Sequence, residues 1–166
     1  MLVYQPAFDI YHTIFRSLKI LLYGKKEYEL LRLRIYDFYY LFPAEFEGMT
    51  FPNELRLFKK YYKNFANPYN QILDKKRIFE RLEPIQNVAY NCLLAYNFID
   101  KKSYEMNLLK LIKNNIPPQL FESVTESNAL DSEILSLLCN FDYLPLFGHR
   151  GLKERTNLME TKYDTN

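Results

Sequence analysis

The sequence predicts a mostly α, compact helical domain, and three observations support this fold class. Apolar residues recur at spacings of three and four along most of the chain, as they do on the buried face of a helix. The composition is 48% hydrophobic with only 4 glycines, which excludes disordered, collagen-like and low-complexity proteins. The length of 166 residues fits a single domain, which we expect over residues 1–145, followed by a C-terminal docking segment over residues 146–166.

Two helices are predicted near the N-terminus. The first covers residues 9–23, with Asp9 as a suitable N-cap. Its apolar stripe consists of Ile10, Tyr11, Ile14, Phe15, Leu18, Leu21 and Leu22. The second covers residues 26–42 and stops at a proline. Its C-terminal end is nearly apolar all round, which predicts burial on several sides, and its polar side is expected to carry Glu29, Arg32 and Asp37.

A third helix, predicted over residues 53–64, carries a basic stripe beside an aromatic one. Between Arg56 and Arg81 there are eight basic and two acidic residues, whereas residues 114–149 contain five carboxylates and no lysine or arginine. Basic side chains neutralise phosphates and tyrosines stack on bases, although two solvated faces of opposite charge would give the same pattern. The candidate nucleic-acid-binding residues are Arg56, Lys59, Lys60, Lys63, Lys75, Lys76 and Arg77.

A winged-helix-like element is indicated farther along the chain. Its outline is a short helix over residues 75–82, a turn at Pro84 and a longer helix to Tyr96. Asn97 then suits the left-handed conformation in which many helices end. We expect Val88 on the inward face of the longer helix. Its polar edge, whose amide side chains are of the kind that reads adenine, carries Gln86, Asn87, Asn91 and Asn97.

The sequence leaves residues 103–114 open between two structures. Tyr104, Leu108, Leu111 and Ile112 fit one helix face, whereas Tyr104, Met106 and Leu108 alternate as in a wing strand, and we favour the helix. Helices are also predicted over about residues 118–124 and 131–141.

The residues form no recognisable catalytic or metal-binding pattern. His12 and His149 are far apart in sequence, and His12 is expected to be hydrogen-bonded at the edge of the first helix. Cys92 and Cys139 lie in apolar helical patterns, so we expect reduced thiols. No glycine-rich phosphate loop, nucleophile elbow or zinc-protease motif occurs in the sequence. We therefore predict that the chain is not an enzyme and uses no metal or cofactor; a small enzyme with His149 as its base is the remaining alternative.

The location of the protein is predicted from its N-terminus and its apolar stretches. The first residues have neither the basic nor the apolar region of a signal peptide. The longest apolar stretches fall far short of the roughly 20 residues that a bilayer requires. We expect a cytoplasmic location without membrane contact.

A segment near the C-terminus has the composition of a docking motif. Residues 148–160 contain two glycines, three basic residues and three apolar residues. A frayed tail would have the same composition. The candidate partner-interface residues are Leu152, Lys153, Arg155, Leu158 and Met159.

Three stretches of the sequence resemble the small middle components of ABC-three-component systems. They are Tyr4–Arg16 (YQPAFDIYHTIFR), Leu31–Pro43 (LRLRIYDFYYLFP) and Gly151–Asp164 (GLKERTNLMETKYD). The resemblance therefore covers both ends of the chain and one of its central helices. Asn157 stands where the family pattern implies a glycine.

This resemblance implies a function based on contact. Such systems, of which Lamassu-type systems are the best-known examples, pair an SMC-like ABC ATPase with an effector, often a nuclease, in bacterial defence against phages or plasmids. The resemblance implies a non-catalytic adaptor that couples the DNA-sensing ATPase to the effector and reaches double-stranded DNA through the complex. From the residues alone, a stand-alone winged-helix DNA-binding regulator is the alternative.

Overall fold

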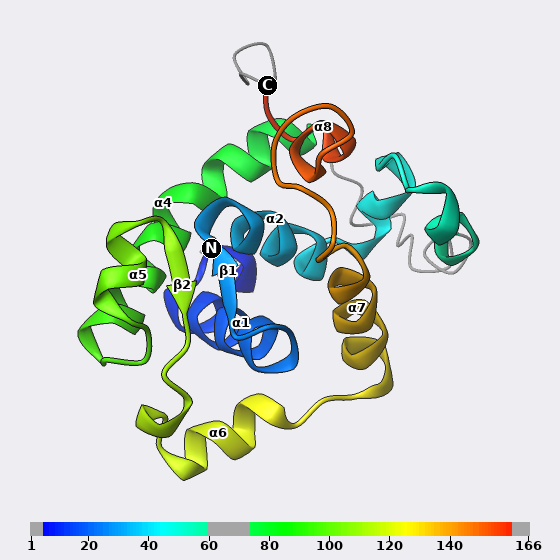
Figure 1. Ribbon diagram of the computed structural model, residues 1–166. Helices are drawn as coiled ribbons and strands as arrows, with labels where there is room; N and C mark the ends of the chain where they lie inside the picture. Colours follow the sequence, from blue (N-terminus) through cyan, green and yellow to red (C-terminus); the bar gives the residue numbers. More distant parts are fainter. Residues whose placement is uncertain (1–4, 60–73, 161–166) are drawn as a thin grey trace.

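Helices make up most of the chain in a computed structural model, which describes residues 5–59 and 74–160 (Figure 1). The expected mostly α fold is confirmed. The helical and strand elements, with 3-10 helices written η, are η1 (Pro6–Phe8), α1 (Ile10–Tyr23), β1 (Glu27–Glu29), α2 (Leu30–Leu41), η2 (Pro43–Gly48), η3 (Asn53–Phe58), α4 (Lys75–Ala95), α5 (Lys101–Glu105), β2 (Leu108–Lys110), η6 (Lys113–Asn115), α6 (Pro118–Thr125), α7 (Ala129–Asn140) and α8 (Leu152–Thr156).

Helix α1 packs against α2, α4 and α6 and is buried along most of its length. As predicted, Asp9 caps it by accepting a hydrogen bond from the backbone N–H of His12. The predicted stripe is wrong in the first turn, because Tyr11 is 80% exposed there. Farther along, Thr13 and Ser17 are fully buried, and each hydroxyl donates to the backbone carbonyl four residues earlier. Local hydrogen bonding thus allows small polar residues inside the core.

Helix α2 begins later than predicted because residues 27–29 form a strand instead of a helical turn. Lys26 has a φ of 63°, which places it in the left-handed region and reverses the chain before β1. Strand β1 then pairs antiparallel with β2, with Tyr28 opposite Leu109. The predicted polar side of α2 is also wrong for two residues: Arg32 is 4% exposed and Asp37 is fully buried.

Helix α4 is continuous where two helices and a turn were predicted. Pro84 lies inside it and removes one backbone hydrogen bond, a loss of about 3 kcal/mol in a free helix. Leu82 and Gln86 on either side of the proline are fully buried, and this packing offsets the loss. The predicted end is confirmed: Asn97 has a φ of 57°, and the N–H of Phe98 reaches back to the carbonyl of Leu93.

The favoured helix over residues 103–114 is wrong for its second half, which contains strand β2. Beyond that strand, Ile99 and Leu111 form an isolated antiparallel bridge. The winged-helix outline predicted over residues 75–96, a short helix, a turn and a longer helix, is wrong because α4 is one continuous helix. Strands β1 and β2 form a two-stranded sheet, and α5 lies between the bridge residue Ile99 and β2.

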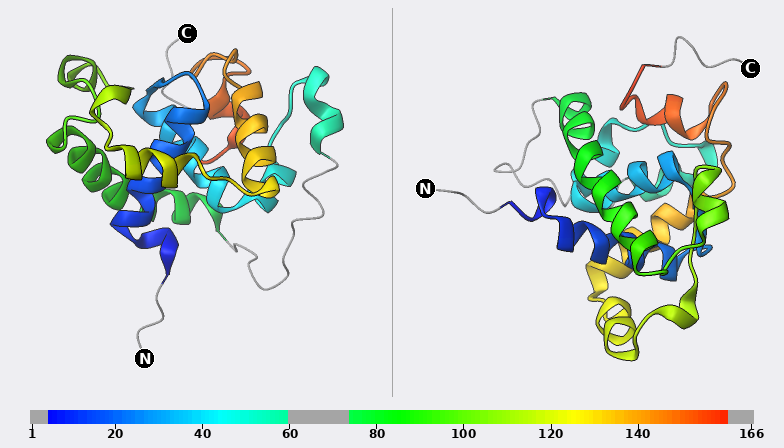
Figure 2. Two further views of the ribbon diagram at one scale, coloured as in Figure 1. Left: turned by 90° about the horizontal axis from the view of Figure 1, so that it is seen from below. Right: turned by 90° about the vertical axis from the view of Figure 1, so that its left-hand side faces the viewer.

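The C-terminal segment shares the hydrophobic core of the preceding residues. Leu146, Leu152 and Leu158 belong to the same cluster as α1, α2, α4 and α7. Part of this core is aromatic: the Tyr39 and Phe46 rings stack at 4.4 Å between centroids. The right-hand view of Figure 2 shows α8 at the same end of the molecule as the start of α4, where the Lys75 ammonium donates to the Thr156 carbonyl. Residues 146–159 are thus not a separate packing unit from the expected domain of residues 1–145.

A buried polar network joins α1, α2 and α4. The two oxygens of Asp37 accept hydrogen bonds from Nε and Nη2 of Arg16, at 2.6 and 3.2 Å. The amide of Gln86 donates to Asp37 at 2.9 Å, and its oxygen accepts from Arg34 at 3.0 Å. The network ends at the surface, where Arg34 also binds Glu83 at 3.1 Å. Because both Asp37 and Gln86 are fully buried, these bonds fix how the three helices meet.

A second polar cluster positions the chain after α7. Arg32 donates to the carbonyls of Phe141 and Leu144, at 3.3 and 2.7 Å. The Asp142 carboxylate accepts from the hydroxyls of Tyr28 and Tyr36, at 2.9 and 2.8 Å. Burial raises the pKa of both tyrosines, and the neighbouring carboxylate raises it further. The hydroxyls therefore remain donors, and residues 141–144 are held against α2.

Removal of the Asp37 carboxylate would leave Arg16 buried without its counter-ion. We expect Asp37→Ala to lower the free energy of unfolding by about 3–5 kcal/mol, measured by urea denaturation followed by circular dichroism. Lys76→Ala is the control, because it removes an exposed pair and should change the free energy by less than about 1 kcal/mol. Equal urea midpoints for Asp37→Ala and the wild type would contradict this role.

Asn157 ends α8 in the left-handed conformation, with a φ of 50°. Asparagine tolerates this region, so it fits the position where the family pattern implies glycine. We expect Asn157→Gly to stay within about 0.5 kcal/mol of the wild type in thermal unfolding. Asn157→Val should lose about 1–2 kcal/mol, since a β-branched residue is strained there. A valine variant as stable as the glycine variant would show that this conformation is unimportant.

Candidate functional site

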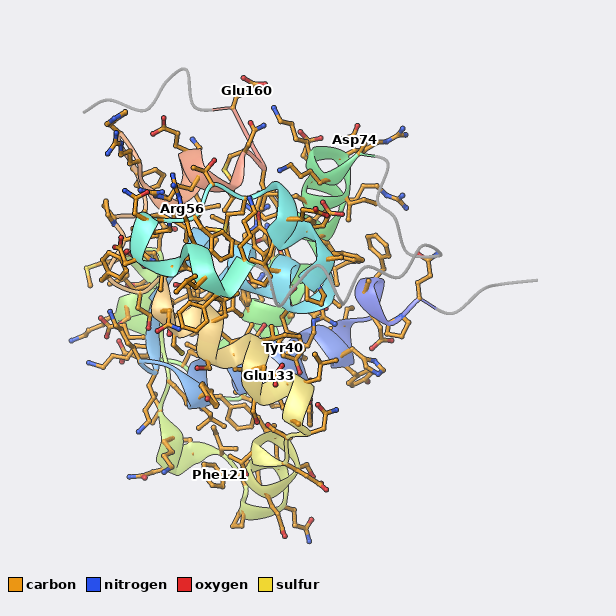
Figure 3. All side chains as sticks on the ribbon, turned by 90° about the vertical axis from the view of Figure 1, so that its right-hand side faces the viewer. Tyr40, Arg56, Asp74, Phe121, Glu133 and Glu160 are labelled. Atoms are coloured by element: carbon orange, nitrogen blue, oxygen red, sulfur yellow. The ribbon has the colours of Figure 1, made fainter. Side chains whose placement is uncertain are left out.

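A basic cleft lies between the η3 region and the C-terminal segment, with a volume of about 590 Å³. We use this name for the space lined by Thr50, Phe51, Pro52, Asn53, Glu54, Arg56, Tyr143, Leu144, Arg150, Glu154 and Arg155. A second cleft of about 570 Å³ adjoins it at Thr50, Phe51 and Arg56 and extends to Lys59. Figure 3 shows the molecule from this side and labels Arg56 on η3 and Glu160 near the end of the C-terminal segment.

The two walls of the basic cleft are bonded to each other through Thr50 and Arg155. The Thr50 N–H donates to the Arg155 carbonyl at 2.9 Å, and Nη1 of Arg155 donates to the Thr50 carbonyl at 3.2 Å. Nε of Arg155 also donates to the Arg150 carbonyl at 2.6 Å. Gly151 allows the tight turn before α8, since a Cβ there would lie 2.5 Å from the carbonyl oxygen of Phe147. The shape of the cleft is thus set by backbone contacts.

Two guanidinium groups in the basic cleft are available to a ligand. Within residues 5–59 and 74–160, the guanidinium groups of Arg56 and Arg150 form no hydrogen bond or ion pair. Both residues are exposed. Planar guanidinium donors suit carboxylate or phosphate oxygens. The cleft can therefore bind an anionic group.

The two carboxylates of the basic cleft already have partners. Glu54 accepts a hydrogen bond from the Tyr143 hydroxyl, and this bond holds the pKa of Glu54 below its usual value. Burial raises the pKa of Tyr143, and the nearby Glu54 adds to the rise, so the hydroxyl stays protonated. Glu154 accepts from the backbone N–H of Arg150 and lies 3.8 Å from the ring of His149. Neither carboxylate pairs with a cleft guanidinium.

The structure separates the candidate nucleic-acid-binding residues into two groups. Arg56 and Lys59 line the second cleft, where the Lys59 ammonium donates to the Met49 carbonyl at 3.0 Å. Residues 53–58 form a 3-10 helix, so the α-helical stripe predicted for them is wrong, although residues three apart share a face in this helix too. Lys60 and Lys63 lie outside the described residues.

The second group is at the start of α4, beside the C-terminal segment. The Lys75 ammonium donates to the carbonyl of Thr156 at 2.9 Å, and burial lowers its pKa while Glu45 opposes the change. Lys76 lies 3.6 Å from Glu160. Arg77 is exposed. These contacts account for two of the three basic residues without a nucleic acid.

Two of the five candidate partner-interface residues are core residues. Leu152 is 1% exposed and Leu158 is fully buried, so neither side chain faces a partner. The reason is that α8 packs its apolar side onto its own chain. Lys153 lies over the Phe147 ring at 5.8 Å, Arg155 lines the basic cleft, and Met159 is half-buried against the core. The interface prediction stays a prediction for these three residues.

The base-reading edge predicted for a stand-alone regulator loses one of its four residues, while Asn91 and Asn97 are exposed as predicted. Gln86 is fully buried between Asp37 and Arg34, whereas Val88, which was expected inside, is 44% exposed. Asn91 accepts a hydrogen bond from the Tyr104 hydroxyl at 3.0 Å. Gln86 therefore leaves the predicted polar edge, because the network around Asp37 requires its amide inside.

The remaining chemical groups form no site in the part of the chain that the structure describes. Cys92 and Cys139 are free, as predicted. The His12 ring is exposed and lies 3.0 Å from Oδ1 of Asp9, at the helix edge where a hydrogen bond was expected. Over residues 5–59 and 74–160, no three histidine, cysteine or carboxylate side chains come close enough to hold a metal ion. No helix in these ranges has the length and apolar character to cross a bilayer.

Sequence reasoning missed Arg150 and Tyr143 as cleft residues. Both are exposed side chains in the irregular segment between α7 and α8, where periodicity gives no information. The available signal was the flanking pair of glycines at 148 and 151, which marks a tight turn beside Arg150. Arg56 and Arg155 were predicted for two separate functions, and the structure places them in one cleft.

Comparison with known proteins agrees with the resemblance noted in the sequence. The family model for the ABC-three component (ABC-3C) system Middle Component 5 matches residues 2–164, which is nearly the whole chain. No curated protein and no solved structure matches it. The chain belongs to the ABC-three component system Middle Component 5 family.

Proposed function

We propose that this chain is a non-catalytic adaptor that binds an SMC-like ABC ATPase and an effector, with a nuclease as the favoured effector. The observation that carries this proposal is the family match over residues 2–164, because a middle component is one part of a system with other components. The proposed setting is bacterial defence against phages or plasmids, of the Lamassu type, in the cytoplasm.

Opposite charges on separate elements support a subunit with two partners. The basic cleft and Lys59 lie around η3. The exposed carboxylates Glu122, Glu126 and Glu133 lie on or next to α6 and α7, where Figure 3 shows Glu133 well away from Arg56. Complementary charges between surfaces favour specific and fast association. One charged face is proposed to bind the ATPase and the other the effector.

Exposed aromatic and aliphatic side chains support protein contacts in the same region. Leu57 and Phe58 project from η3, and Tyr143 and Phe147 from the segment before α8. Aromatic residues are enriched at protein interfaces, because they bury a large area with few rotatable bonds. Tyr143 also shares the lining of the basic cleft with Arg56 and Arg150, and arginine is likewise enriched at interfaces. The η3 side is therefore the proposed main interface.

Contact with double-stranded DNA is proposed through the assembled complex. Arg56 and Lys59 share one side of η3, and Lys60 and Lys63 follow in the sequence. Such a group would add phosphate contacts to those of the ATPase. The local net charge supports a supplementary contact of this kind.

The adaptor proposal predicts a stable complex with proteins encoded by neighbouring genes. We expect the tagged full chain, co-expressed with them, to elute with the ATPase in size-exclusion chromatography at micromolar concentration. This requires a Kd of about 1 μM or below, or about −8 kcal/mol. If the chain elutes alone at 20.1 kDa beside a soluble, folded ATPase, the adaptor function is wrong.

The DNA contact predicts a salt-dependent effect of charge reversal. The triple variant Lys59→Glu/Lys60→Glu/Lys63→Glu should weaken DNA binding by the complex, more strongly at low salt. The plot of log K against log salt should become less steep, by about 0.9 in slope for each lost phosphate contact. The matched control reverses Lys101, Lys102 and Lys110, which are exposed on α5 and β2. Equal salt slopes for the two triple variants would mean that the basic stripe is only a solvated surface.

A further inference from the structure

The basic cleft contains more donor capacity than its own carboxylates use. Arg56 and Arg150 each present a complete guanidinium group without a partner in the described ranges. Arg155 uses Nε and Nη1 for backbone carbonyls. Two forked donors, Arg56 from η3 and Arg150 from the turn before α8, thus remain for a ligand in one cleft. A guanidinium group can bind carboxylate or phosphate oxygens with two parallel hydrogen bonds.

The charge of the cleft distinguishes these two classes of anion. Glu54 and Glu154 remain beside the three arginines, which leaves a small net positive charge with negative groups interspersed. A nucleic-acid backbone carries about one negative charge for each 1.7 Å of duplex and would place phosphates against both carboxylates. A peptide can carry a few carboxylates separated by neutral residues. The interspersed charges therefore favour an acidic peptide segment.

Apolar groups around the cleft also fit a peptide. Tyr143 lines the cleft and is 57% exposed. Phe51 and Leu144 also line the cleft and are buried. A peptide that alternates carboxylates with apolar side chains would satisfy the guanidinium groups and cover the exposed Tyr143 ring.

The cleft needs little rearrangement to receive such a segment. Its walls are joined by the reciprocal bonds between Thr50 and Arg155, and residues 141–144 are anchored by Arg32. A preformed site loses less conformational entropy on binding than a flexible one. Affinity can therefore come from a short segment.

We propose that the basic cleft binds an acidic peptide segment of a partner protein, whose carboxylates pair with Arg56 and Arg150 and whose apolar side chains cover Tyr143. This inference rests on the proposed adaptor function for the existence of the partner. The cleft itself, its charge and its exposed rim are properties of the isolated chain, so its binding chemistry is measurable without the partner.

The first experiment uses the isolated full chain and a fluorescein-labelled ten-residue peptide of alternating glutamate and leucine. Fluorescence anisotropy should show saturable binding that weakens at least about tenfold in Arg56→Glu/Arg150→Glu, as expected for loss of close charge pairs. The control Lys101→Glu/Lys102→Glu, with the same change of charge on α5, should bind as the wild type does. Thermal unfolding of each variant verifies that it is folded.

Three results of this titration would overturn the proposal. They are the absence of saturable binding, equal affinity of the arginine variant and the wild type, and preference for a lysine–leucine peptide of the same length. A DNA oligonucleotide of equal net charge is titrated in parallel. If it binds more tightly than the peptide and depends on the same two arginines, the cleft is a nucleic-acid site instead.

The second experiment maps the contact in the co-purified complex. Arg56→Lys and Arg150→Lys retain the positive charge and supply amines that a zero-length carboxyl-to-amine cross-linker couples to nearby carboxylates. Mass spectrometry should find these lysines joined to aspartate or glutamate of one partner segment. If the complex forms equally well with Arg56→Glu/Arg150→Glu, the proposed role of the cleft is wrong, whereas the adaptor function stands. If the chain binds the acidic peptide but no neighbouring protein, the adaptor function is wrong, whereas the binding chemistry of the cleft stands.

Discussion

The ion pair between Arg16 and Asp37 is the constraint on which the helical arrangement depends. A carboxylate transferred from water to a protein interior loses several kcal/mol of solvation, so Asp37 requires partners on several sides. Arg16 from α1 and Gln86 from α4 supply them, with distances of 2.6 to 3.2 Å. Buried ion pairs add little net stability compared with apolar residues, but few arrangements satisfy all their bonds. The pair therefore specifies how α1, α2 and α4 meet, and the exposed face of α4 follows from it.

Polar contacts of Arg32 and Asp142 fix the chain beside the cleft in the same way. Arg32 binds two carbonyls just after α7, and Asp142 accepts hydrogen bonds from Tyr28 on β1 and Tyr36 on α2. These hydrogen bonds fix the position of residues 141–144, from which the chain continues to the cleft. Leu152 and Leu158 complete the fit by filling the core. The cleft is thus a consequence of buried contacts, and the side chains of Arg56 and Arg150 lie at its surface.

The sequence predicted local structure well and long-range structure less well. The N-cap at Asp9 and the left-handed Asn97 depend on neighbouring residues only, and both are confirmed. Pro84 misled the prediction, because the burial that keeps α4 intact comes from α1 and α2. Strand β1 could not be predicted from its own residues, because its pairing partner β2 lies about eighty residues away in the sequence. In the site, Arg56 and Arg155 were identified as separate residues, but their shared cleft depends on the bonds of Thr50, which no local pattern reveals.

The C-terminal segment shows why an apolar pattern does not by itself identify an interface. Leu152 and Leu158 belong to a segment with the composition of a docking motif, and they do dock, but onto their own chain. Hydrophobic periodicity indicates that one face of an element is buried, but it does not indicate whether the same chain or another chain covers that face. Charge carries the missing information, because a cation that folds onto its own chain acquires a partner, as Lys75 does with Thr156. Arg56 and Arg150 acquire none among the described residues, and they line one cleft, which is the reason to propose that a partner binds there rather than at the leucines.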